Sequence, residues 1–185
     1  MCPPPIKGKN AEKEEENTFE IPRTPIHRRY QIGDVLKAGQ KILVQVVKEE
    51  RGNKGAALTT YFTLPGRYTV MMPNNPQAGG ISRKINDASE RDALRKVYEK
   101  LDIPSLMGLI VRTAGGELGQ HNKVEDNIKT DFKHLKTRWE DIQKAFEKAK
   151  KQEKNEISCI HEDGSLIIRA LRDMAKDDVS QIVIS

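Results

Sequence analysis

The sequence contains few cysteines and no long apolar segment. Cys2 and Cys159 are the only cysteines among 185 residues, and no Cys-x-x-Cys pair or Cys/His cluster accompanies them. A structural zinc site and a disulfide framework therefore lack the residues they need. The longest apolar runs are far shorter than the roughly 20 residues of a membrane-spanning helix, and the N-terminal MCPPPIKGKN lacks the apolar core of a signal peptide. We expect a cytoplasmic protein with no transmembrane segment.

Motifs typical of common enzymes are also absent. The sequence has no Gly-x-Ser-x-Gly, P-loop or His-Glu-x-x-His motif, and its four histidines are dispersed. Adjacent acids such as Glu49 and Glu50 would point to opposite faces of a strand, which disfavours a metal site. Asp173 and Asp177 would share one helix face, which we predict to be a solvated edge. We therefore predict no catalytic residue and no metal ligand.

The charge balance favours an acidic partner. Lys and Arg together number 32, against 27 for Asp and Glu, so the net charge is +5. Nucleic acid is the usual partner of a basic surface, although many basic proteins bind none.

Turn and strand signals predict a tail followed by a β-meander. Residues 1–30 are rich in Pro, Lys and Glu and are predicted to be disordered or a linker. Ile32, Val35 and Leu36 fit one helical turn or a tight loop. Apolar segments separated by Gly-containing loops then predict an antiparallel meander of three strands: Lys41–Lys48, Ala56–Leu64 and Arg67–Met72.

The next part of the chain is predicted to form two amphipathic helices with a short strand between them in the sequence. The first begins at Asp87, with Glu90 three residues later as in a capping box. The second begins at Asn122 and carries an apolar stripe over about 25 residues. Lys144–Glu156 is expected to be its frayed end or a linker, and Met107–Val111 is predicted to be a strand.

The last segment is predicted to form a hairpin, a helix and a strand. Asp163-Gly164 is the expected hairpin turn. The elements are Ile157–His161 and Ser165–Arg169 as the hairpin, Leu171–Lys176 as the helix and Val179–Ile184 as the strand. The fold class predicted for the whole chain is α+β.

The stretch LIVRTAGG, residues 109–116, combines a buried strand with potential anion ligands. Arg112 offers a planar fork of donors and Thr113 a hydroxyl, and Gly115 and Gly116 allow close backbone approach. A strand end with a surface arginine is the simpler interpretation, and composition alone leaves both open. If the sheet brings the polar loops to one edge, a convergent anion site would contain Lys54, Arg83, Lys84 and Arg112.

Three long motifs resemble the bacterial RNase E/G endoribonucleases. They are KEERGNKGAALTT (Lys48–Thr60), MPNNPQAGGISRKI (Met72–Ile85) and GLIVRTAG (Gly108–Gly115), in the order and spacing of that family. The resemblance extends from about Gln31 to the C-terminus. It implies that residues 31–60 are the last part of an OB-fold RNA-binding domain, 61–156 a 5′-sensor domain, and 157–185 the start of an RNase H-like segment.

The resemblance also implies a role for individual residues. Arg112 and Thr113 would hold the 5′-monophosphate of an RNA, Gly66 would contact it through its backbone, and Val70 would pack on the terminal nucleotide. Arg83 and Lys84 would lie near the phosphate, and Lys54 would contact the RNA backbone.

The implied function is RNA binding and 5′-monophosphate sensing within a single-strand endoribonuclease of RNA processing and decay. The family's Mg²⁺ ligands and structural Zn²⁺ link have no counterpart here, so we expect no cofactor and no hydrolysis by this chain alone. The alternative is a standalone, non-catalytic RNA-binding protein or a structural remnant of a split gene. Single-stranded RNA is the expected partner, and an incomplete barrel could also recruit a complementing chain or a second copy.

Overall fold

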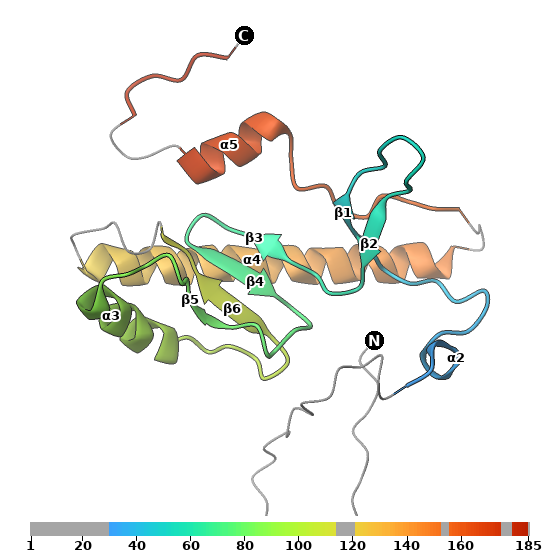
Figure 1. The fold of residues 1–185 in the computed structure, drawn as a ribbon, viewed down its shortest axis with the longest axis horizontal. Coiled ribbons are helices and arrows are strands. Elements are labelled where there is room, and N and C mark those ends of the chain that lie inside the picture. Colours follow the sequence, from blue (N-terminus) through green and yellow to red (C-terminus); the bar gives the residue numbers. More distant parts are fainter. Residues whose placement is uncertain (1–29, 114–120, 153–155, 175–178, 185) are drawn as a thin grey trace, which may run out of the picture. The chain divides into compact units, whose positions relative to one another are not determined.

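The computed structural model describes residues 30–113, 121–152, 156–174 and 179–184. The predicted disorder of residues 1–29 and the expected contributions of Gly115, Gly116 and Asp177 lie outside these ranges. The chain divides into two compact units between Thr60 and Tyr61, and each is described by itself (Figure 1).

The first unit contains one helical turn and one hairpin. Helix α2 spans Ile32–Val35, so of the two predicted alternatives the helical turn is present. Strands β1 (Gln45–Lys48) and β2 (Ala57–Thr59) pair antiparallel, which confirms the predicted pairing, although both strands are shorter than expected. In the loop, Arg51 and Lys54 exchange backbone hydrogen bonds of 3.0 and 3.1 Å, and Gly52 adopts a φ of +56° that favours glycine.

The second unit contains a four-stranded sheet in the order β3-β4-β6-β5 (Figure 1). Its strands are β3 (Leu64–Pro65), β4 (Thr69–Met72), β5 (Gly80–Ile81) and β6 (Gly108–Val111). Strand β4 pairs antiparallel with both β3 and β6, whereas β5 pairs parallel to β6.

The predicted single meander is wrong, because its strands belong to two sheets. The chain leaves the first sheet after β2. The backbone N–H of Phe62 donates to the Asn74 side chain at 3.0 Å rather than to a neighbouring strand. The Phe62 ring packs against Trp139, with centroids 5.3 Å apart. Long-range contacts of this kind interrupt the predicted strand Ala56–Leu64.

Two helices supply most of the core beneath the sheet. Helix α3 spans Ala88–Glu99, and its predicted cap is confirmed, because Asp87 accepts a hydrogen bond from the Glu90 N–H. Helix α4 spans His121–Lys151. Residues from β6, both helices and the segment before α3 form one buried cluster: Ile85, Leu94, Val97, Val111, Val124 and Ile128.

Helix α4 is longer than predicted. The Lys/Glu-rich run after Lys144 remains helical to Lys151. Lys and Glu are good helix formers, and oppositely charged neighbours pair along this turn of the helix, such as Lys150 with Glu147 at 3.6 Å.

The predicted C-terminal hairpin and strand are also wrong within the described residues. Leu166–Met174 forms helix α5, and neither 156–165 nor 179–184 is a strand. No turn is assigned at Asp163-Gly164 either, although Gly164 has a φ of +66°. Apolar residues at helical spacing, following Ser165, explain the helix: the Ile168 N–H lies 3.5 Å from the Ser165 hydroxyl oxygen.

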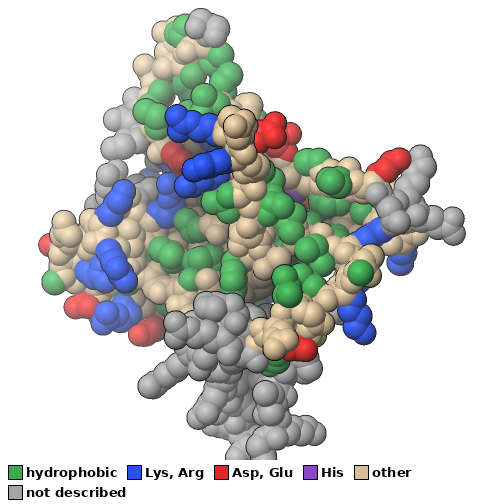
Figure 2. All heavy atoms as spheres, turned by 45° about the vertical axis from the view of Figure 1, so that its right-hand side comes forward, with side chains coloured by type: hydrophobic (Ala, Val, Ile, Leu, Met, Phe, Trp, Pro, Cys, Tyr) green, Lys and Arg blue, Asp and Glu red, His purple; other side chains and the backbone are tan. Residues whose placement is uncertain are grey.

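The fold is therefore α+β, with two sheets and four helices in the described part of the chain. Large apolar side chains remain exposed on β1, β2 and α5, among them Val47 at 60% and Leu166 at 75%. Figure 2 shows such side chains at the surface among groups of Lys and Arg. None of the described helices is both long enough and apolar enough to cross a membrane.

Candidate functional site

The topology of the second sheet places several cationic segments at the same end of its strands (Figure 1). Because β5 and β6 run parallel, the residues that follow them lie at the same end of the sheet. These residues are Arg83 and Lys84 after β5, and Arg112 and Thr113 after β6. Strand β4 is antiparallel to β6, so the turn that precedes it, Gly66–Tyr68, lies at this end as well. We call this end of the sheet the Arg112 edge.

Arg112 is fixed at this edge through both its backbone and its side chain. Its N–H donates to the carbonyl of Tyr68 at 2.8 Å. Its Nη1 donates to the carbonyl of Gly66 at 2.7 Å and to Oδ1 of Asp173 at 2.6 Å. The side chain remains 31% exposed. A guanidinium that is aligned by a carbonyl and open to solvent on one side is suited to bind an anion.

Val70 lies on the same face of the sheet as Arg112. Thr69 pairs with Val111, and Val70 with Ile110. Thr69 and Val111 are fully buried, whereas Val70 and Ile110 are half-buried. Since side chains alternate along a strand, the face of Val70 and Ile110 continues toward Arg112. An apolar surface therefore adjoins the guanidinium.

The turn before β4 is held by a carboxylate from helix α4. Oδ2 of Asp131 accepts hydrogen bonds from the N–H groups of Tyr68 and Thr69, at 3.0 and 2.8 Å, and from the Thr69 hydroxyl at 2.8 Å. Its Oδ1 accepts from the N–H of Arg67 at 3.3 Å. Consecutive N–H groups that converge in this way form an anion-binding nest, and here the protein's own carboxylate occupies it.

A side chain at Gly66 would displace the carboxylate of Asp131 from this turn. A Cβ on Gly66 would lie 2.6 Å from Oδ1 of Asp131 and 2.7 Å from its Cγ. The Gly66 N–H donates to the carbonyl of Thr69 at 2.8 Å, and its carbonyl accepts from Arg112. In this structure the backbone of Gly66 therefore orients Arg112 and supports the turn.

The basic turn after β5 is held by Arg91 of helix α3. Its Nη1 donates to the carbonyls of Ser82 and Ile85, at 3.0 and 3.1 Å. These bonds flank Arg83 and Lys84, which are both exposed. Ser82 in turn donates its N–H to the Val111 carbonyl at 2.8 Å, so the basic turn is tied to the strand that carries Arg112.

The two other predicted residues differ in their placement. Thr113 is exposed and follows Arg112 directly. Lys54 is exposed in the β1–β2 loop of the first unit, so it is not among the residues that the second sheet brings together.

Helix α5 contributes acidic and basic side chains to the Arg112 edge. Arg172 binds both carboxylate oxygens of Asp163, at 3.1 and 3.0 Å, and the carbonyl of Pro65 at 3.2 Å. It also donates to Asp173 at 3.3 Å. Asp173 is exposed, as predicted for a solvated helix edge, but the prediction missed its ion pairs with Arg112 and Arg172.

These ion pairs keep their members charged. Burial raises the pKa of Asp173, but hydrogen bonds from Arg172 and Arg112 outweigh it and hold the pKa below its usual value. Burial likewise lowers the pKa of Arg172, and the hydrogen bonds to Asp173 and Asp163 raise it above its usual value. Arg112 therefore faces a carboxylate anion at neutral pH.

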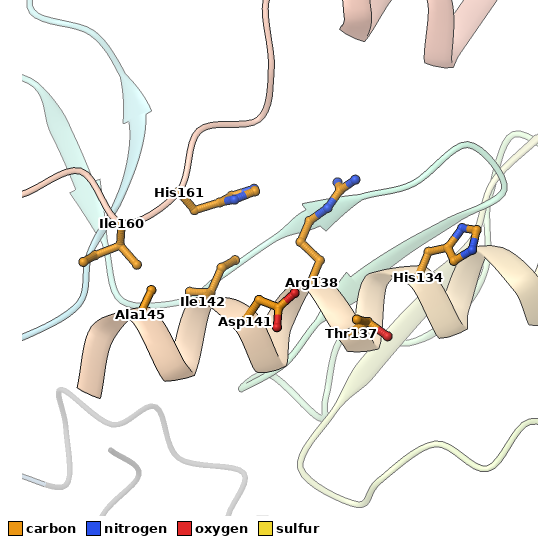
Figure 3. Close-up of a pocket in the computed structure, with 8 residues that line it drawn as sticks. All are labelled: His134, Thr137, Arg138, Asp141, Ile142, Ala145, Ile160 and His161. Carbon is orange, nitrogen blue, oxygen red and sulfur yellow. The ribbon is translucent and has the colours of Figure 1, made fainter. Parts of the chain in front are cut away.

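A separate shallow pocket lies between helix α4 and the segment after it (Figure 3). Figure 3 shows His161 pointing along the helix toward Arg138, with Asp141 on the helix below. Asp141 would oppose an anion here, and the pocket contains no residue of the Arg112 edge. Its lining consists of His134, Thr137, Arg138, Asp141, Ile142, Ala145, Ile160 and His161.

The described residues contain no group of three or more His, Cys, Asp or Glu side chains that could hold a metal ion.

The residues that position the site carry little signal in the sequence. Asp131 has a polar position beside the apolar stripe of α4, and nothing in that pattern indicates a partner more than 60 residues away. Arg91 likewise resembles any exposed helix cation. Asp173 was noticed in the sequence as an acid on a short amphipathic helix, but its ion-pair partner depends on how the chain folds.

A sequence model of the Ribonuclease E/G family matches residues 63–185. The chain belongs to the Ribonuclease E/G family. This match confirms the membership that the three motifs predicted.

Similar proteins from several bacteria carry the same family names. The chain is 46% identical to Ribonuclease E of Haemophilus influenzae over 156 residues, which are 84% of this chain and 16% of that protein. It is 44% identical to Ribonuclease E of Escherichia coli over 158 residues, 85% of this chain and 14% of the relative. Identity to Ribonuclease G of Escherichia coli is 35% over 151 residues, 82% of this chain and 28% of the relative. The chain thus spans a minor part of the relatives it matches.

Proposed function

We propose that the Arg112 edge binds the 5′-monophosphate end of single-stranded RNA, as part of an RNase E/G-type endoribonuclease of RNA processing and decay. The observation that carries this proposal is the parallel pairing of β5 and β6. It places the Arg83-Lys84 turn and the Arg112-Thr113 segment at one end of the sheet. Membership of a ribonuclease family makes RNA the anionic ligand that this end would receive.

The chemistry of the edge suits a terminal phosphate. A guanidinium matches phosphate oxygens through two parallel donors, and the carboxylate on Arg112 shows that an oxyanion fits there. The exposed Arg83, Lys84 and Thr113 would add charge and a hydroxyl donor. A phosphate monoester carries about −1.5 to −2 charges at neutral pH, whereas a 5′-hydroxyl carries none. Val70 offers a half-buried apolar surface for the terminal nucleotide.

The domain assignment follows the family resemblance. We propose that residues 31–60 belong to an OB-fold RNA-binding domain, with Lys54 contacting the RNA backbone, that 61–156 form the 5′ sensor, and that 157–185 begin an RNase H-like segment. Exposed apolar side chains on β1 and β2 would be covered by a complementing chain or a second copy. We predict no RNA hydrolysis by this chain with Mg²⁺, to be measured on purified protein with a contaminating-nuclease control.

The binding test compares two RNAs that differ only at the 5′ end. A short single-stranded RNA, labelled at its 3′ end, is prepared with a 5′-monophosphate or a 5′-hydroxyl and titrated with the full chain in an anisotropy assay. We expect the monophosphate to bind roughly 10-fold more tightly, since charge-assisted hydrogen bonds contribute about 1.5–3 kcal/mol. Arg112→Ala should bring the two affinities together, and Arg112→Lys should retain part of the difference because charge remains without the fork.

Arg95→Ala is the matched control. Arg95 lies on α3, has a side chain 61% exposed, and its nearest acid is 3.8 Å away, so this variant loses the same charge without touching the Arg112 edge. It should retain the preference for the monophosphate. Equal affinity of the wild-type chain for both RNAs, or an unchanged ratio in Arg112→Ala, would refute the proposal.

A further inference from the structure

Arg112 already has an anionic partner in the free protein. The partner is Asp173 near the end of α5, at 2.6 Å from Nη1. The same Nη1 donates to the Gly66 carbonyl at 2.7 Å. A phosphate oxygen that approached this nitrogen would therefore compete with a carboxylate that is fixed in the same chain.

Asp173 is held beside Arg112 by a neighbouring ion-pair network. Arg172 binds Asp163 and the Pro65 carbonyl, and so attaches the end of α5 to the strand that precedes Gly66. Arg138 lies 3.8 Å from Asp163 and adds a further cation. The network consists of three arginines and two carboxylates and therefore has one positive charge in excess, so as a whole it attracts an anion. Its members are Arg112, Arg138, Arg172, Asp163 and Asp173.

The network also allows Asp173 to leave Arg112 at low cost. Asp173 accepts hydrogen bonds from the Nε and Nη2 of Arg172, at 3.3 and 3.4 Å. If a ligand displaced it from Arg112, its carboxylate would still be paired with Arg172. An exchange that left a buried charge without a partner would be unfavourable. After this exchange, Asp173 would remain paired with Arg172, and Arg112 would be paired with the phosphate.

We infer that Asp173 is an internal competitor at Arg112, which sets the affinity of the Arg112 edge for RNA 5′-phosphates. The inference rests on the proposed function. Asp173 occupies the anion position when no RNA end is present, and a terminal phosphate, with its higher charge, replaces it. Removing the carboxylate therefore strengthens phosphate binding, whereas removing a residue that only orients Arg112 would weaken it.

Asp173→Asn tests this directly in the anisotropy assay with the same two RNAs. The 5′-monophosphate RNA should bind about fivefold more tightly, the scale of one partly exposed ion pair. The 5′-hydroxyl RNA should change by less than about twofold, because it presents no terminal phosphate. Asp92→Asn, at a carboxylate 70% exposed on α3, is the control for the loss of one negative charge and should change neither affinity.

A double variant separates competition from a general charge effect. In an Arg112→Ala background, Asp173→Asn should no longer tighten binding of the monophosphate RNA. Unchanged or weaker binding in the single variant, or an equal gain for both RNAs, overturns the inference. If wild type prefers the monophosphate and Arg112→Ala abolishes that preference while Asp173→Asn gives no gain, only this inference fails. If Arg112→Ala leaves the preference unchanged, the proposed function itself fails. Circular dichroism melting curves verify that each variant is folded.

Discussion

Asp131→Ala is expected to lower the free energy of unfolding by about 3 kcal/mol, because a buried donor left without its acceptor costs about 1–3 kcal/mol. The carboxylate of Asp131 accepts hydrogen bonds from the N–H groups of Arg67, Tyr68 and Thr69 and from the Thr69 hydroxyl. Thr69 is completely buried, so water does not readily replace the lost acceptor.

The same substitution should weaken recognition of the RNA end. The turn that Asp131 holds contains Gly66, whose carbonyl aligns Arg112, and Tyr68, whose carbonyl accepts the Arg112 N–H. If the turn changes its conformation, Arg112 loses these two hydrogen bonds, which fix its position. We expect the ratio of monophosphate to hydroxyl affinity to fall severalfold at a temperature where the variant is still folded.

Thermal unfolding followed by circular dichroism measures the stability change. Asp131→Asn should lose less stability than Asp131→Ala, since the amide oxygen keeps two acceptor lone pairs for the donors that bind Oδ2, while the amide nitrogen faces the Arg67 N–H. Asp126→Ala is the control, because Asp126 lies exposed on the same helix and should change stability by no more than about 0.5 kcal/mol. A melting temperature of Asp131→Ala equal to that of this control would contradict the prediction.

Gly108→Ala is expected to destabilise the second unit by at least about 3 kcal/mol, at the upper end of single substitutions. A Cβ at Gly108 would overlap the carbonyl oxygens of Ala78 and Asn75 and lie 2.9 Å from the Ala78 carbonyl carbon. These are backbone atoms, so the clash is not relieved by a side-chain rotation. Relief would require a shift of strand β6 or of the loop that precedes β5.

The consequence for the candidate site follows from the position of Gly108 at the start of β6. A displaced β6 would move Arg112 relative to β4 and β5. Gly55→Ala serves as the control, because a Cβ at Gly55 has no neighbour within 4 Å. Hydrogen exchange of the β6 amides should show lost protection in Gly108→Ala and unchanged protection in Gly55→Ala. Wild-type protection and melting temperature in Gly108→Ala would show the close packing to be dispensable.

Local sequence patterns predicted the elements whose partners are nearby in the chain. The Asp87 cap, the β1–β2 hairpin and the strand that ends at Val111, just before Arg112, were predicted and are present. Each depends on a cap, a short loop or a run of apolar residues, which are properties of neighbouring residues. The C-terminal hairpin failed because Leu166–Met174 fits both a strand and an amphipathic helix over a short window, and no described strand pairs with it.

The sequence by itself determined the family, the basic balance and the identity of Arg112 as a candidate anion ligand. Only the tertiary structure decided what surrounds that arginine. The parallel pairing of β5 with β6 brings Arg83 and Lys84 to its edge, and contacts across more than 60 residues bring Asp131 to the turn and Asp173 to the guanidinium. The reason is physical: the free energy of these hydrogen bonds and ion pairs depends on atoms that the packing of helices on a sheet brings together, and no local pattern in the sequence encodes that proximity.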